Sequence, residues 1–224
     1  MSRVFDGSPA SEGMGTGRVR VVDWAVPTVP HRMVEAEAVE AEVERFHEAR
    51  ERVRVRLEEL KAGTESRLGP VEARIFDPQI LMLQDAEVVE GTVRYIRENR
   101  LTAARAFDWR MMELQTLWTR TSHPFLLDRL NDLEDLQVRL LNELLGQSDP
   151  FAIHHEDGRV VIVARNVTPS MTVQLDPARV AGIGPPGPDA AHDEGLQADR
   201  HHTTAPRLLH PDVGSPLDRD RRPF

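Results

Sequence analysis

Apolar and polar positions nearly alternate near the start of the chain, over residues 17–24 (GRVRVVDW). Val19, Val21 and Trp24 occupy the apolar positions, which is the period of a β-strand that buries one face. Pro27 follows and ends the run, because proline has no backbone N–H to donate to a strand ladder. The pattern therefore predicts one strand followed by a stiff connector.

The period becomes helical after the connector. Apolar residues recur at intervals that place them in one seam of a long helix, which we expect to end at residues 62–64 (AGT). The residues of this seam are Val39, Val43, Phe46, Val53, Leu57 and Leu60. A second apolar run, residues 75–83, follows and is interrupted by Pro78.

Further helices are predicted from their end signals. Asp85 and Thr102 each precede a helical pattern and have side chains that can accept hydrogen bonds from a first turn. Pro124 fits the first turn of the next helix, and Gly146 provides its stop. Helices of this length pack as antiparallel hairpins, so we expect a helical bundle.

The period changes again after the bundle. Residues 160–164 (VVIVA) form a short β-branched run, which is typical of a buried strand. Thr168 and Pro169 form a helix start, and residues 180–183 form a second short apolar run. Strand, helix and strand in this order predict a βαβ unit.

These changes of period predict the domain boundaries. Residues 1–32 contain the first strand, residues 33–147 a helical domain, and residues 148–183 the βαβ part. Residues 184–224 are rich in proline and histidine and have no apolar period, so we expect an irregular, disordered tail. The predicted fold class is α+β, with a helical bundle inserted into an incomplete α/β domain.

Composition and charge exclude several classes of function. The chain of 224 residues has no cysteine, which excludes a disulfide framework, a thiolate metal site and a cysteine nucleophile. A net charge of -9 argues against nucleic-acid binding and permits a basic protein partner. No apolar run approaches the ~20 residues of a membrane span, and no apolar signal core opens the chain. We therefore expect a cytoplasmic protein without membrane insertion.

Four stretches carry a family resemblance. Residues 7–13 (GSPASEG) precede the valine-rich strand, residues 75–85 read IFDPQILMLQD, and residues 129–141 form a leucine-rich helix with two aspartates. Residues 161–176 read VIVARNVTPSMTVQLD. In this order and spacing they resemble the N-terminal half of Enzyme I of the bacterial sugar phosphotransferase system, the phosphoenolpyruvate–protein phosphotransferase. The resemblance covers roughly residues 4–183.

This resemblance implies a fold and a partner. The family builds an α/β phosphohistidine (swivelling) domain around an inserted helical domain that docks the small phosphocarrier HPr. The residues that match its HPr-facing patch are Leu81, Met82, Asp85, Glu87 and Val88. An apolar centre with an acidic rim suits a carrier whose active histidine is ringed by basic residues. The alternative is that Leu81 and Met82 are ordinary core residues.

The resemblance also implies a phosphoryl-transfer chemistry. A histidine of the family accepts phosphate from phosphoenolpyruvate and passes it to HPr, because a neutral imidazole is nucleophilic at neutral pH. By resemblance Thr172 lies against this histidine, whose place falls in residues 188–194 (PDAAHDE), beside His192. This segment lacks the family's paired glycines and Thr-Ser, and its acidic residues repel phosphate. His202 is a second candidate, and solvated tail histidines are the alternative for both.

The family's phosphoenolpyruvate-binding barrel uses Mg²⁺ and needs about 250 residues, which this chain does not offer. We therefore expect no cofactor and no metal in this chain, and a protein that is inactive alone. A frameshift or truncation before the phosphohistidine motif would explain residues 184–224. Three hypotheses remain: an Enzyme I-like phosphotransfer protein that acts on HPr, a non-catalytic phosphocarrier-binding or regulatory helical module, and a helical scaffold with an unrelated partner.

Overall fold

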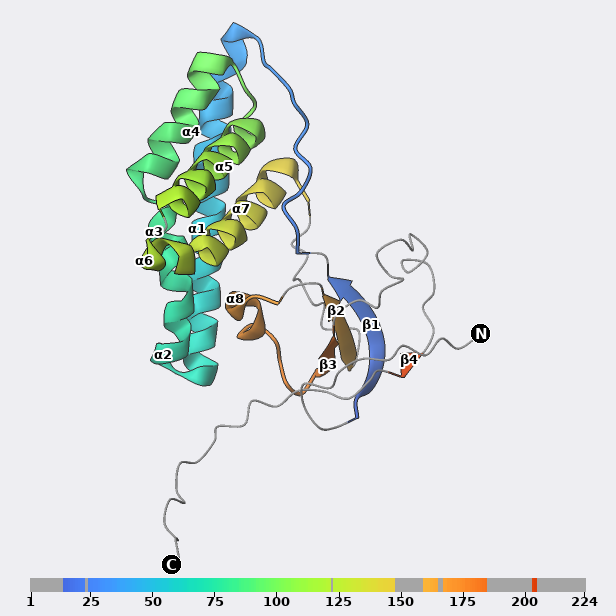
Figure 1. Ribbon diagram of the computed structural model, residues 1–224. Helices are drawn as coiled ribbons and strands as arrows, with labels where there is room; N and C mark the ends of the chain where they lie inside the picture. Colours follow the sequence, from blue (N-terminus) through green and yellow to red (C-terminus); the bar gives the residue numbers. More distant parts are fainter. Residues whose placement is uncertain are drawn as a thin grey trace, which may run out of the picture. The chain divides into compact units, whose positions relative to one another are not determined.

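The computed structural model describes residues 14–22, 24–121, 123–147, 159–164, 167–184 and 203–204. The fold is mostly helical with a small sheet that contains a parallel strand pair (Figure 1). Its elements in chain order, with η for a 3₁₀ helix, are β1 (Thr16–Val22), η1 (Ala36–Ala38), α1 (Val39–Leu68), α2 (Pro70–Ala73), η2 (Arg74–Phe76), α3 (Asp77–Met82), α4 (Ala86–Asn99), α5 (Ala103–Thr121), α6 (Pro124–Asp128), α7 (Leu130–Leu145), β2 (Val160–Ala164), α8 (Pro169–Thr172), β3 (Val180–Gly184) and β4 (Thr203–Thr204).

The chain divides into two compact units. One contains β1 as far as Val21 together with β2, β3 and β4, and the other contains Val22–His154 and Arg165–Leu175. Every described α-helix, α8 included, therefore belongs to the second unit, which we call the helical unit. The boundaries drawn from sequence kept α8 with the strands, and those boundaries stay predictions.

α1 is the longest element and carries the apolar seam predicted for it. Phe46 and Leu57 of this seam are almost completely buried. The helix does not end at residues 62–64, and this prediction was wrong: it continues through Gly63 and ends at Gly69, whose φ is 108°. A glycine inside a helix costs only about 1 kcal/mol, so packing can carry the helix past it. The left-handed φ marks the true end, because glycine adopts it without steric cost.

The other predicted helix ends are largely confirmed. The Asp85 carboxylate accepts a hydrogen bond from the Glu87 amide at 2.8 Å, as expected of a cap. The Thr102 hydroxyl accepts from the Arg105 amide at 3.4 Å at the start of α5. Gly146 ends α7 with a φ of 65°. The helix expected from Pro124 is divided into α6 and α7.

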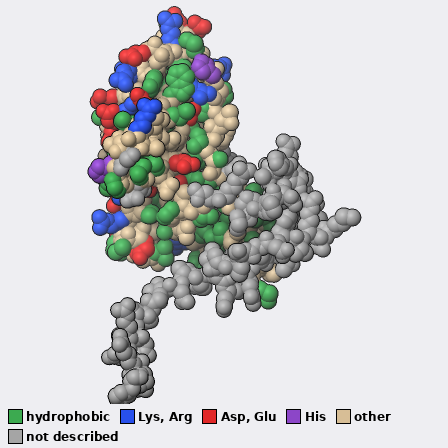
Figure 2. All heavy atoms as spheres, in the orientation of Figure 1, with side chains coloured by type: hydrophobic (Ala, Val, Ile, Leu, Met, Phe, Trp, Pro, Cys, Tyr) green, Lys and Arg blue, Asp and Glu red, His purple; other side chains and the backbone are tan. Residues whose placement is uncertain are grey.

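The core of the helical unit lies between its long helices. α4 packs on α5, α5 packs on α7, and α7 returns to α1. Phe46, Phe107 and Leu136 are completely buried among them. Charged side chains of both signs are scattered over the visible surface of these helices, among apolar and other side chains (Figure 2). The bundle expected from the apolar period is therefore confirmed.

The first unit, which we call the strand unit, is built around β2 and β3. These strands are parallel, with Val161 opposite Gly182 and Ile162 opposite Ile183, as expected of a βαβ sequence. The sheet order is β3-β2-β1-β4, and β1 pairs antiparallel with β4. Gly17 of β1 lies so close to the Arg159 carbonyl that a Cβ there would stand 2.5 Å from its oxygen. Only glycine allows this approach of the two backbones.

Candidate functional site

α3 is a short helix with two contrasting faces. Pro78 stands in its first turn, where its missing N–H costs no hydrogen bond, so it starts the helix and does not interrupt it. The Gln79 side chain is completely buried, whereas Leu81 is 67% exposed. One side of α3 therefore contacts the interior of the helical unit, and the other carries an apolar side chain into solvent.

The buried face of α3 meets a polar cluster centred on Asp135 of α7, which is 2% exposed. Its carboxylate accepts hydrogen bonds from Trp24 Nε1 at 2.8 Å, Ser170 Oγ at 2.6 Å and Gln79 Nε2 at 3.3 Å. A buried carboxylate is stable only where donors replace its water shell. Because these donors come from distant parts of the sequence, Asp135 connects the N-terminal connector, α3, α7 and α8.

The sequence did not reveal this cluster. Asp132, on the same helix, instead forms an ion pair with Arg129 at 3.0 Å. The donors to Asp135 could not be predicted from the sequence, because Trp24 and Ser170 are far from Asp135 along the chain. One signal was available: the Thr-Pro-Ser segment places a hydroxyl on the first turn of α8.

Thr172 lies on the exposed side of α8. Its hydroxyl donates to the Thr168 carbonyl at 3.1 Å, a common arrangement for a threonine on a helix surface. His192 and His202, the candidate phosphate acceptors, lie outside the described residues. The expected pairing of Thr172 with an acceptor histidine therefore stays a prediction.

The five residues expected to face a partner are distributed between surface and interior. Leu81 is exposed and is not a core residue, and Met82 is half-buried against the core. Asp85 and Glu87 are exposed at the N-terminal end of α4. Val88 is 3% exposed inside the core, so it can support such a surface only from beneath.

Further apolar side chains of the helical unit reach solvent. Val71 of α2 is 76% exposed and Leu68 at the end of α1 is 50% exposed. Figure 2 shows hydrophobic side chains on the lower part of the helical unit, where α2 lies. They do not belong to the apolar seam of α1 because they lie at helix ends, outside its period. We call Val71, Leu81, Asp85 and Glu87 the α2–α4 surface.

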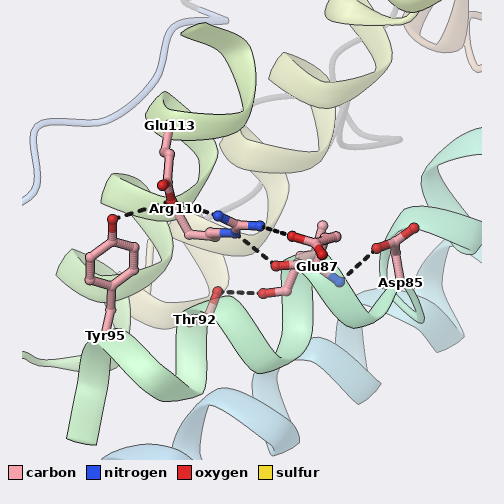
Figure 3. Close-up of polar contacts among 7 residues, drawn as sticks. Asp85, Glu87, Thr92, Tyr95, Arg110 and Glu113 are labelled. Atoms are coloured by element: carbon pink, nitrogen blue, oxygen red, sulfur yellow. Dashed lines mark hydrogen bonds and ion pairs between the residues drawn. The ribbon is translucent and has the colours of Figure 1, made fainter. Parts of the chain in front are cut away.

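Arg110 of α5 holds Glu87 at the start of α4 (Figure 3). The guanidinium donates to the Glu87 carboxylate at 2.5 Å and to the Glu87 carbonyl at 2.7 Å. It also donates to Glu113 at 2.5 Å, and this hydrogen bond lowers the pKa of Glu113. Tyr95 donates to the same carboxylate at 3.2 Å, and burial raises the pKa of Tyr95.

The described residues contain no group of three or more histidine, cysteine, aspartate or glutamate side chains that could hold a metal ion. None of the helices within the described ranges is long and apolar enough to cross a membrane.

Comparison with known proteins identifies the family. Residues 6–129 match the family model described as PEP-utilising enzyme, N-terminal. Relatives named phosphoenolpyruvate-protein phosphotransferase include those of Staphylococcus epidermidis, 28% identical over 82% of this chain, and Haemophilus influenzae, 28% identical over 80% of it. The alignments cover 32% and 31% of these relatives, so this chain spans about a third of their length.

A solved structure agrees. The NMR solution structure of Enzyme I (nEIt) superimposes with a TM-score of 0.70 and 26% identity, covering 81% of this chain and 73% of that one. The family model spans more than half of the 224 residues, and the structural match covers most of both chains. The chain therefore belongs to the PEP-utilising enzyme family, whose N-terminal region it contains, and it has the fold of the Enzyme I N-terminal domain.

Proposed function

We propose that the helical unit docks a small phosphocarrier protein of the HPr type through the α2–α4 surface. In this proposal the protein acts in the cytoplasm, as part of a phosphotransferase system that serves sugar uptake. The observation that carries this proposal is the exposure of Leu81 on a helix whose opposite face is locked into the interior by Gln79. Family membership supports it, as does the likeness to proteins named phosphoenolpyruvate-protein phosphotransferase.

The chemistry of the surface fits such a partner. Leu81 provides an exposed apolar side chain on α3, and apolar side chains at the centre of an interface contribute most of the binding energy. Asp85 and Glu87 provide negative charge at its edge, on a chain whose net charge is -9. A carrier with basic residues around its active histidine would be steered toward this edge and aligned on it.

The docking proposal is tested by one substitution and a matched control. Leu81→Asp places a charge at the centre of the proposed interface and should weaken binding of a bacterial HPr by 30-fold or more, the loss of about 2 kcal/mol expected of a central contact. Met33→Asp is the control, since Met33 is 62% exposed but lies in the extended segment before α1. Titration calorimetry gives both affinities. Equal weakening by the two variants would contradict the assignment of this surface.

We further propose that this chain docks the carrier without accepting its phosphate, because residues 188–194 lack the glycines and hydroxyls expected around a phosphohistidine. The chain is mixed with phosphorylated HPr, and its intact mass is read at alkaline pH, where phosphohistidine survives. An unchanged mass with HPr still bound supports a docking or regulatory module. A gain of one phosphate supports an Enzyme I-like transfer protein, and mapping then distinguishes His192 from His202.

A further inference from the structure

Arg110 is a buried cation directly beneath an exposed carboxylate. Its side chain is 6% exposed, whereas the side chain of Glu87, which it binds at 2.5 Å, is 78% exposed. The guanidinium holds the Glu87 carbonyl as well, so it fixes both the backbone and the side chain of this residue. Figure 3 shows Arg110 reaching from α5 to the first turn of α4, where Asp85 caps the helix.

Gly91 makes room for this reach. A Cβ built on Gly91 would lie 2.4 Å from Arg110 Nε and 2.8 Å from its Cδ, closer than real contacts allow. Glycine in a helix interior costs about 1 kcal/mol relative to alanine. The backbone of Gly91 is ordinary helix without a positive φ, so its conformation does not require glycine. The passage of the arginine side chain is what requires it.

We propose that Arg110 is a positioning residue that presents Glu87 in one orientation to the docked phosphocarrier, and that Gly91 is the opening through which it acts. The proposal rests on the docking function proposed above. A free glutamate at a helix start loses about 0.5–1.5 kcal/mol of side-chain entropy when a partner immobilises it. Arg110 has already removed this freedom by holding one carboxylate oxygen, and the other oxygen stays available to a donor of the partner.

The arrangement also determines which partners fit. Arg110 is shared between Glu87 and Glu113, so it neutralises part of the negative charge at this edge. A partner therefore gains less from its overall positive charge and more from a donor placed at the open Glu87 oxygen. This favours a directed hydrogen bond from one basic side chain over general electrostatic attraction.

A double-mutant cycle on HPr binding tests the proposal. Arg110→Met removes the cation, and Glu87→Gln removes the carboxylate charge. Each single variant should weaken binding on the order of 5-fold. The double variant should bind little more weakly than either single variant, because each substitution already removes the Arg110–Glu87 ion pair. A purely structural role of Arg110 would instead give effects that multiply. Thermal melts followed by circular dichroism confirm that each variant is folded.

Gly91→Ala tests the same positioning of Glu87 while Arg110 remains in the sequence. The added methyl group displaces the arginine, so binding should weaken on the order of 5-fold as in Arg110→Met. Gly63→Ala is the matched control, because a Cβ on Gly63 meets nothing within 4 Å. It should leave HPr affinity unchanged.

The possible failures are distinguishable. If Arg110→Met and Gly91→Ala leave the affinity for HPr unchanged, the positioning role of Arg110 is overturned while the docking function stands. Multiplicative effects in the cycle would have the same consequence. No binding of HPr by the unaltered chain would overturn the docking function and this inference together. Should Arg110→Met fail to fold, the cycle is run with Gly91→Ala and Glu87→Gln, and the same two outcomes decide.

Discussion

Two carboxylates of the helical unit show opposite uses of the same group. Asp135 is 2% exposed and accepts hydrogen bonds from an indole, an amide and a hydroxyl. Glu87 keeps 78% of its side chain exposed although an arginine holds it. Where water is excluded, a carboxylate needs hydrogen-bond donors from the protein, and these hydrogen bonds then hold parts of the fold together. Where water remains, one fixed oxygen leaves the other free for a partner.

α3 connects these two regions. Gln79 contributes a donor to the Asp135 cluster, and Leu81, two residues later, lies in the α2–α4 surface. The cluster therefore sets the position of the helix that presents the surface. Changes at Asp135 should reduce folding stability, whereas changes at Leu81 or Glu87 should reduce binding with little effect on stability.

The largest effect is expected from Asp135→Ala. The substitution leaves the donors of Trp24, Gln79 and Ser170 without their acceptor, and breaking a buried charged network costs about 3–5 kcal/mol. Urea unfolding followed by circular dichroism measures the loss. Asp85→Ala removes an exposed cap and should cost only about 1 kcal/mol. A loss at Asp135 no larger than that at Asp85 would show that the buried cluster adds nothing special to the fold.

A smaller loss is expected from Ser170→Ala on α8. The Ser170 hydroxyl donates to the Asp135 carboxylate at 2.6 Å, and a hydrogen bond to a charged group contributes about 1.5–3 kcal/mol. Thr172→Ala, on the same short helix but exposed, should change stability by no more than about 0.5 kcal/mol. Both are measured by urea unfolding. Equal losses would mean that α8 is not held through Asp135.

Local signals explain why much of the fold could be predicted from sequence. Asp85, Thr102 and Gly146 act through their own helix ends, and the valine-rich run 160–164 forms its strand by its own preference. The family motifs added the topology, since they place strands on both sides of the helices. Each of these signals lies within a few consecutive residues.

The parts that were missed depend on contacts between distant residues. Gly63 lies inside α1 because packing outweighs its low helix propensity, and nothing in its neighbourhood of sequence indicates this. Ser170 and Asp135 meet only in the folded chain, as do Gly91 and Arg110. Val88 matched the family's docking patch but turns inward, because a motif does not state which side of a helix is covered.

The smallest effect concerns Asp132, three residues before Asp135 on α7. Burial raises its pKa above the ordinary value of 3.8, although Arg129 opposes the shift through a hydrogen bond. The folded state therefore holds its proton more tightly than the unfolded state does, and stability falls as pH rises from 3.8 through the raised pKa. Below 3.8 both states are protonated, and the penalty is absent.

Asp132→Asn removes this titration while keeping the shape of the side chain. The variant should therefore gain stability relative to the unaltered chain at pH 7, and the gain should shrink as the pH is lowered toward 3.8. Urea unfolding at both pH values measures the difference, with Glu134→Gln, exposed on the same helix, as the control for a general loss of negative charge. A variant that is less stable at pH 7 would show that the ion pair with Arg129 outweighs the cost of burying Asp132. Asp132 and Asp135 of α7 would then both stabilise the fold in their charged forms. The exposed carboxylates of α4 would differ from them in function, binding a partner, as well as in burial.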